Sequence, residues 1–284
     1  MKNPFHRPLP LARTALLGAG LLACAAALPS PVNAQRTDAE WLENCRSNSS
    51  RWDDGRSRFC EVREESLRAG GTLTVDGGQN GGATIRGWDG DQVRVSARIQ
   101  VYAPTEARAR ELARQVTVRT TGSHVRAEGP EQSRGTGWSV VYDIQVPRRQ
   151  DVSVVTRNGP LAVEDVRGRM TLRASNGPVS LRRVGGTVHA RVQNGPLNVV
   201  LDGDRWNGDG LDAESVNGPV TLVVPRTYSA QLEVGNVNGP VNVDLPLPEG
   251  FRSGRHLKTT LGGGGAPVRV VTTNGPLTVR REGR

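Results

Sequence analysis

The sequence predicts an all-β protein, a parallel β-solenoid that resembles a single-stranded β-helix with coils of about 18–23 residues. The first observation is a tripeptide, Asn-Gly-Pro, that recurs at intervals of 18, 18, 23, 21 and 36 residues. A near-constant period of this length is typical of stacked repeats. The tripeptides mark six repeat corners: Asn158, Asn176, Asn194, Asn217, Asn238 and Asn274.

The second observation is the apolar pattern on both sides of each corner. The third and fifth residues after every Asn are Leu or Val, as in Leu161 and Val163. The sixth and fourth residues before it are also apolar, as in Met170 and Leu172. Alternation with a period of two predicts short, half-buried strands. Each repeat is therefore expected to contain a strand, a corner and a second strand.

The third observation is the proline of the tripeptide. Asn-Gly between apolar runs is normally a hairpin signal, and a meander of hairpins is the alternative fold. However, a two-residue hairpin needs the N–H of the residue after Gly, and proline has none. Proline also keeps the preceding Gly in extended conformation. We therefore expect a corner that redirects the chain, with parallel coils whose Asn side chains hydrogen-bond to one another.

The chain begins with a predicted signal peptide, residues 1–34. Three basic residues precede an apolar stretch, Ala15 to Leu28, and Val32-Asn33-Ala34 forms a small-residue cleavage site. The alternative is lipidation at Cys24, because Leu21-Leu22-Ala23-Cys24 is similar to a lipobox. We expect cleavage after Ala34, and membrane attachment only if Cys24 is lipidated.

An N-terminal segment, residues 35–69, follows the signal peptide. Asp38 to Cys45 is expected to form a short helix capped by Thr37 or Asp38, and residues 47–58 a polar loop. Two cysteines of an exported chain, Cys45 and Cys60, are expected to form a disulfide that closes this loop.

The solenoid domain is predicted to cover residues 70–284, with an irregular part at 70–150 and the Asn-Gly-Pro repeats at 151–284. Strands are expected at about 72–75, 93–101, 116–119, 124–127 and 138–146. Asn80-Gly81-Gly82 opens a degenerate first copy, because Ala83 and Ile85 occupy the same offsets as the later apolar residues.

One amphipathic helix, near residues 105–116, interrupts the strands. Ala109, Leu112 and Ala113 recur at helical spacing, and Glu106 can pair with Arg110. We expect the helix to cover an edge or end of the sheet, since open ends invite strand addition. At the other end, the glycine run at 262–265 replaces a tripeptide, which predicts an irregular coil or hairpin that closes the C-terminal end.

Composition and motifs argue against several functional classes. Loss of residues 1–34 removes three positive charges and no negative one, so the net charge falls from +9 to +6. No basic cluster or aromatic platform suggests nucleic-acid binding. The sequence contains no phosphate loop, no serine elbow and no closely spaced pair of histidines, so no motif points to an enzyme or a cofactor. We therefore expect a non-enzymatic protein without a cofactor.

A longer corner offers the candidate metal site. Asp202, Asp204, Asn207, Asp209 and Asp212 could present oxygen atoms to Ca²⁺. The spacing does not match an EF-hand loop, and an ordinary polar turn is the alternative that we favour.

Outward positions can also be aligned by counting back from each Asn. At the fifth position the order is Ser153, Thr171, His189, Asp212 and Glu233, and at the third it is Val155, Arg173, Arg191, Glu214 and Gly235. Neighbouring coils should place His189 beside Asp212 and Arg191 beside Glu214. We interpret these as charge pairs on a solvated face.

Taken together, several features resemble the bacterial "putative adhesin" family: the Asn-Gly-Pro coils, residues 85–95, the helix near 107–116 and the stretch 261–276. The resemblance covers roughly residues 70–280 and implies an exported β-solenoid of unknown function.

We expect an envelope or cell-surface interaction module that binds an envelope protein or glycan. Recognition would use a flat face of outward side chains or strand addition at an edge. Two alternatives are a carbohydrate-active or Ca²⁺-dependent glycan-binding solenoid, and an envelope sensor that binds another protein.

Overall fold

A computed structural model describes residues 37–47, 55–245 and 255–283 and contains two ten-stranded sheets. Sheet A consists, in spatial order, of β1 (Ser57–Arg68), β4 (Gln92–Ala103), β7 (Gly137–Pro147), β3 (Ala83–Trp88), β9 (Leu161–Glu164), β11 (Val179–Arg182), β13 (Leu197–Val200), β15 (Val220–Val224), β20 (Leu277–Arg281) and β17 (Val241–Val243). Sheet B consists of β18 (His256–Leu261), β16 (Ala230–Asn238), β19 (Pro267–Asn274), β14 (Gly210–Asn217), β12 (Gly185–Asn194), β10 (Arg167–Asn176), β8 (Asp151–Asn158), β2 (Thr72–Asp76), β6 (His124–Glu128) and β5 (Thr117–Arg119). The predicted signal peptide, with Cys24, lies outside the described residues.

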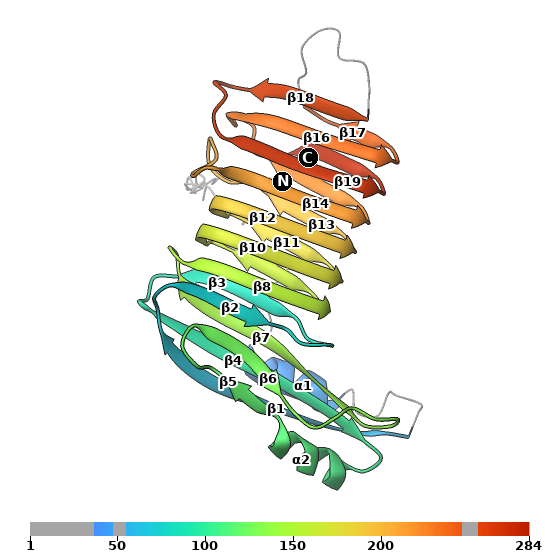
Figure 1. Ribbon diagram of the computed structural model, residues 1–284. Helices are drawn as coiled ribbons and strands as arrows, with labels where there is room; N and C mark the ends of the chain where they lie inside the picture. Colours follow the sequence, from blue (N-terminus) through green and yellow to red (C-terminus); the bar gives the residue numbers. More distant parts are fainter. Residues whose placement is uncertain (1–36, 48–54, 246–254, 284) are drawn as a thin grey trace, which may run out of the picture. The chain divides into compact units, whose positions relative to one another are not determined.

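Each Asn-Gly-Pro coil contributes one strand to each sheet. The strand of sheet B ends at the Asn, Gly-Pro makes the corner, and the strand of sheet A follows. Coils pair in parallel and in register, with Asn176 opposite Asn158 and Val179 opposite Leu161. Figure 1 shows these strands side by side with their arrows in the same direction. The predicted corner and the β-solenoid fold are therefore confirmed.

The core lies between the two sheets, where the predicted inward residues face one another. All twelve apolar residues before the corners are at most 2% exposed, and ten of the twelve after the corners are at most 1% exposed. Val241 and Val243, in the strand at the edge of sheet A, are half-buried. Aliphatic residues repeat in every coil because each layer buries its side chains on those of the next.

Glycine is needed at the corner for two reasons. Gly195 has a φ of +151°, and four other repeat glycines have φ values from +138° to +156°. The backbone is extended, as expected, but on the positive-φ side that residues with a Cβ rarely adopt. In addition, a Cβ on Gly195 would lie 2.2 Å from the carbonyl oxygen of Gly177 in the adjacent coil.

The first part of the domain begins as a coil and continues as antiparallel strands. β2 and β3 form the degenerate first copy, in which Ala83 lies opposite Leu161 and Ile85 opposite Val163. β4 and β7 then pair antiparallel, and β1 pairs antiparallel with β4. β1 is a strand that the sequence did not predict, because its charged residues obscure the alternation. Charges are common on edge strands, where they prevent further pairing.

The two helices cover β1 and β4. α2 (Glu106–Gln115) is capped by Thr105, carries the expected Glu106–Arg110 ion pair, and adds Ala109, Leu112 and Ala113 to the core. It packs on β1 and β4 at the end of sheet A, as expected for a covering helix. No helix among the described residues is long and apolar enough to cross a membrane.

α1 (Asp38–Ser47) is held to the sheet by a disulfide and an ion pair. Thr37 and Glu40 form a reciprocal cap at its start. Cys45 is bonded to Cys60 of β1, and Asp38 pairs with Arg98 of β4 at 2.6 Å. The predicted disulfide is thus formed, and it joins the helix to the edge of sheet A.

The coil order at the C-terminal end differs from the sequence order. β18 lies antiparallel to β16 and forms the edge of sheet B. The glycine run then turns the chain back, so that β19 enters between β14 and β16 (Figure 1). The expected closing element is therefore β18, and the last repeat lies inside the stack, not at its end.

Candidate functional site

Asparagines form a continuous ladder along one corner of the coils. Each Nδ2 donates to the Oδ1 of the preceding Asn in the stack at 2.8–3.2 Å. The stacking order is Asn80, Asn158, Asn176, Asn194, Asn217, Asn274 and Asn238. The six predicted corners and the degenerate copy thus join in one row. Because the amides bond to one another, we interpret the ladder as architecture.

The enlarged corner between β13 and β14 is anchored by an aromatic residue. Trp206 is 5% exposed, and its Nε1 donates to the carbonyl oxygen of Gly186 at 2.9 Å. The extra residues of this coil therefore do more than lengthen a turn, since they place an indole against the neighbouring coil.

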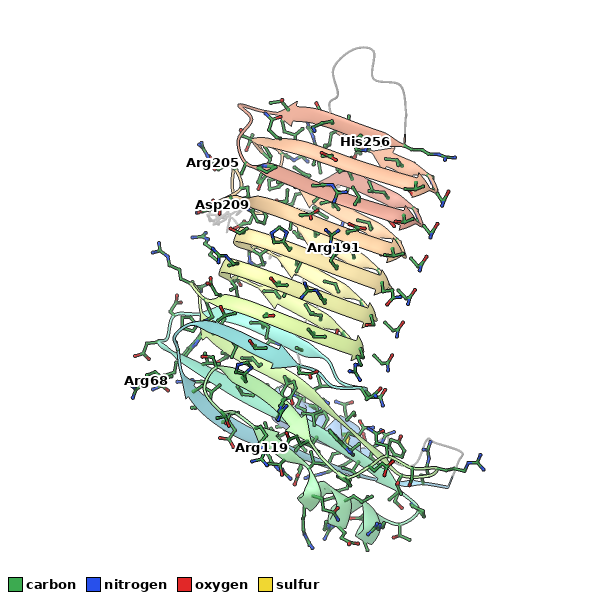
Figure 2. The ribbon with its side chains drawn as sticks, viewed as in Figure 1. Arg68, Arg119, Arg191, Arg205, Asp209 and His256 are labelled. Atoms are coloured by element: carbon green, nitrogen blue, oxygen red, sulfur yellow. A yellow bond between two sulfur atoms is a disulfide. The ribbon has the colours of Figure 1, made fainter. Side chains whose placement is uncertain are left out.

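The candidate Ca²⁺ residues have different surroundings. Asp202, Asp204 and Asn207 are exposed, and Asp209 accepts a hydrogen bond from Thr187 at 2.6 Å. Asp212 belongs to β14 and is bound by arginines on the outer face of sheet B. Figure 2 shows Asp209 at the corner, away from the middle of the sheet. Within the described residues, no three His, Cys, Asp or Glu side chains are placed to hold a metal ion.

The C-terminal half of the outer face of sheet B is an ion-pair network. His189 lies opposite Asp212 and Arg191 opposite Glu214, as the sequence predicts. Arg191 forms ion pairs with both Glu214 and Asp212. Arg191 lies on the face of sheet B turned to the viewer in Figure 2. These charges neutralise one another on a solvated face, where each pair adds only a small stability.

Arg269 belongs to this network but was absent from the columns aligned in the sequence. The expected column places Glu233 next to Asp212, but Arg269 of β19 lies between them, at 2.7 Å from Asp212 and 3.5 Å from Glu233. Like charges directly opposite each other on neighbouring strands are unfavourable. The two adjacent acids in the predicted column were therefore a signal that a basic residue separates them.

The coils of β8 and β10, which adjoin this network, have a different character. None of the arginines at their outward positions or at their entry into sheet B makes an ion pair with any described residue. We call this set the arginine cluster: Arg149, Arg157, Arg167, Arg169 and Arg173. Arg173 lies between Val155, which is 39% exposed, and Arg191. The cluster is therefore a concentration of positive charge in which no arginine forms an ion pair with a described residue.

Neighbouring arginines at the corner after sheet A are paired, which sharpens the contrast. Arg183 bonds to Asp165 at 2.8 Å and also to Glu164, and Arg148 bonds to Asp89 at 2.7 Å. The hydrogen bond from Arg183 holds the pKa of Asp165 below its usual value. The chain therefore does supply acidic partners to arginines close to the cluster, and the absence of ion pairs in the cluster is a feature of that part of the surface.

Fold and repeat together define a parallel β-solenoid stacked from Asn-Gly-Pro coils. The chain belongs to the Toastrack DUF4097 family, whose model matches residues 53–280. This match confirms the family recognised from the sequence, and it includes β1, which the sequence-based resemblance did not reach. No curated protein matches the chain.

Several solved structures are similar to the chain at low identity. A putative cell adhesion protein from Clostridium sporogenes is 9% identical, with 79% of this chain and 100% of that chain covered and a TM-score of 0.43. A putative adhesin from Bacteroides fragilis is 10% identical, with 78% and 97% covered and a TM-score of 0.30. A putative lipid binding protein from Parabacteroides distasonis is 12% identical, with 78% and 96% covered and a TM-score of 0.30.

Proposed function

We propose that the protein is an exported, non-enzymatic interaction module of the bacterial envelope. It binds an envelope component through the outer face of sheet B. The observation that carries this proposal is the uneven charge of the face. Charges of β12, β14, β19 and β16 are paired, whereas the arginine cluster in the coils of β8 and β10 makes no ion pair with a described residue. An acidic partner would balance it.

Rigidity of the face supports recognition of this kind. In-register strands hold the outward side chains of successive coils about 4.8 Å apart, and the aliphatic core beneath them is closed to solvent. A surface that is already ordered loses little conformational entropy when it binds. Arg169, Thr171 and Arg173 project from one strand of this face and need no rearrangement to meet a partner.

The disulfide supports a location outside the cytoplasm. Disulfides persist in oxidising compartments and are rare in the cytosol, and Cys45 is bonded to Cys60. The predicted signal peptide leads to the same placement. We therefore place the mature chain in the periplasm, on the outer membrane surface or outside the cell.

The test has two parts. The tagged full-length chain is expressed in a bacterial host, and its location is determined by cell fractionation. The purified mature chain is then sedimented with envelope fragments. We expect the double variant R169Q/R173Q to lose at least three-quarters of the bound protein, and R114Q/R134Q, which removes two exposed charges elsewhere, to bind like the wild type.

Two results would overturn the proposal. One is recovery of the chain in the cytoplasmic fraction, and the other is equal binding by R169Q/R173Q and the wild type. The non-enzymatic part has its own measurement. Release of soluble fragments from the envelope material, above the level of a blank, would show that the protein is an enzyme.

A further inference from the structure

A hollow of about 700 Å³ lies at the corner where the chain enters the strands of sheet B. It crosses the coils of β2, β8, β10, β12 and β14, which are consecutive in the sheet. Four steps of about 4.8 Å make it roughly 19 Å long. We call this hollow the glycine groove, and its residues include Gly71, Arg149, Gln150, Arg167, Gly186 and Gly208.

The groove exists because side chains cannot occupy its floor. Gly186 has a φ of +99° and Gly208 a φ of +137°. A Cβ on Gly186 would lie 2.1 Å from the carbonyl oxygen of Gly168, and a Cβ on Gly208 would lie 2.4 Å from the Cα of Gly186. Stacked coils therefore approach one another through backbone atoms here. The floor is therefore formed by backbone atoms and carries no side chain at these two positions.

Two arginines from the cluster lie side by side at this groove. Arg149 and Arg167 are bridge partners on adjacent coils, and both side chains are exposed. Like charges opposite each other on neighbouring strands are unfavourable, yet neither makes an ion pair with a described residue. A bound oxyanion would relieve this repulsion, because a guanidinium binds a carboxylate through two parallel hydrogen bonds.

The rest of the lining suits a polar chain. Gln150 is 7% exposed, and its Nε2 donates to the carbonyl oxygens of Gly71 and Asp151. The carboxylate of Asp151, which also lines the groove, accepts the backbone N–H of Arg169 at 2.7 Å. Asn207 lies at the far end, where an adjoining hollow of about 480 Å³ begins.

We propose that the glycine groove binds an extended acidic oligosaccharide, with one carboxylate held between Arg149 and Arg167. The length of the groove, its open floor of backbone atoms and its paired arginines match an extended chain that carries regularly placed acid groups. This inference rests on the proposed function, since it names the envelope component as an acidic glycan. It also assigns that component to the groove and not to the flat face alone.

The test is calorimetric titration of the purified mature chain with oligogalacturonate of defined length at 0.15 M salt. At this ionic strength, charges further apart than about 8 Å are largely screened. We expect R149Q/R167Q to weaken binding at least tenfold. R114Q/R134Q, which removes the same charge elsewhere, should stay within twofold of the wild type. Fully methyl-esterified oligogalacturonate should bind at least tenfold more weakly than the acid form.

A second variant adds a negative charge to the groove without removing an arginine. Asn207 is exposed at its end, and N207E should weaken binding at least threefold while thermal unfolding stays close to that of the wild type. This variant separates repulsion of an acidic ligand from a folding defect in R149Q/R167Q.

Four outcomes would overturn the inference: no binding of oligogalacturonate, an equal loss in R114Q/R134Q and R149Q/R167Q, no effect of N207E, or polyphosphate binding at least tenfold tighter than oligogalacturonate. Failure of the groove assignment alone can be told from failure of the proposed function. If R149Q/R167Q still sediments with envelope fragments while oligogalacturonate does not bind the wild type, the groove assignment falls and the envelope role stands.

Discussion

The corner glycine provides the sharpest test of how the repeat specifies this fold. In Gly195→Ala, the new Cβ would lie 2.2 Å from the carbonyl oxygen of Gly177 and 2.7 Å from its carbon. Real Cβ atoms stay at least 3.0 Å from such atoms, so adjacent coils would have to separate by almost 1 Å. The backbone hydrogen bond from Gly177 N to Asn194 O, now 2.9 Å, lies directly in this region.

Two costs combine in this variant. An alanine at a φ of +151° costs about 1–3 kcal/mol. Loss or lengthening of one corner hydrogen bond costs about 1 kcal/mol more. We therefore expect Gly195→Ala to lower the free energy of unfolding by about 3 kcal/mol, measured by urea denaturation followed by circular dichroism.

The matched control is Gly203→Ala. Gly203 also has a positive φ, +71°, but no atom lies within 4 Å of its Cβ position. Only the conformational cost of about 1–2 kcal/mol applies. If both variants lose the same free energy, contact between stacked corners is not what requires glycine, and the reasoning is wrong. A wild-type stability for Gly195→Ala would be a still stronger contradiction.

Three further predictions concern the ladder, the disulfide and a buried tyrosine. Asn194→Ala removes two ladder hydrogen bonds and Asn238→Ala only one. Urea denaturation should therefore show a loss of about 1–2 kcal/mol in the free energy of unfolding for Asn194→Ala and about half of that for Asn238→Ala. Equal losses would mean that the ladder adds no stability. The variant C45S/C60S should lose about 3 kcal/mol, because the disulfide closes a loop with a sequence separation of 15, and its thermal midpoint should no longer respond to a reducing agent, as that of the wild type does. Tyr142 is fully buried and its hydroxyl has no hydrogen-bond partner among the described residues, so Tyr142→Phe should be at least as stable as the wild type at pH 7. Burial raises the pKa of Tyr142 in the folded chain, so the unfolded chain loses this proton at a lower pH. Wild-type stability should therefore fall as pH rises above about 10, and the fall should be smaller in Tyr142→Phe. Identical pH profiles for the two proteins would contradict the raised pKa of Tyr142.

The arginine cluster shows the limit of reading a site from sequence. Arg173 and Arg191 occupy equivalent positions in consecutive coils. Each lies three residues before a corner Asn, so the sequence gives no reason to expect different surroundings for them. In the structure Arg191 is neutralised by Glu214 and Asp212, whereas Arg173 has no acid within reach among the described residues. Pairing depends on the next coil, and an offset within one repeat does not contain that information. The glycine groove was not predicted for the same reason, since it arises from five coils together.

The sequence by itself determined the coil. The missing N–H of proline argued against the hairpin, and the period of two separated inward from outward residues. The helix that follows Thr105 and the Cys45–Cys60 bond were predicted from local spacing. Tertiary structure alone decided the order of the last coils. Repeats that end at Asn238 and Asn274 carry the same apolar pattern, so either could stack on the coil of Asn217 with its core buried equally well. The chain places Asn274 there, and Arg269 then separates Asp212 from Glu233. The repeated pattern specifies how any two coils pack on each other. The stacking order of the coils depends on charges and turns that are far apart in the sequence.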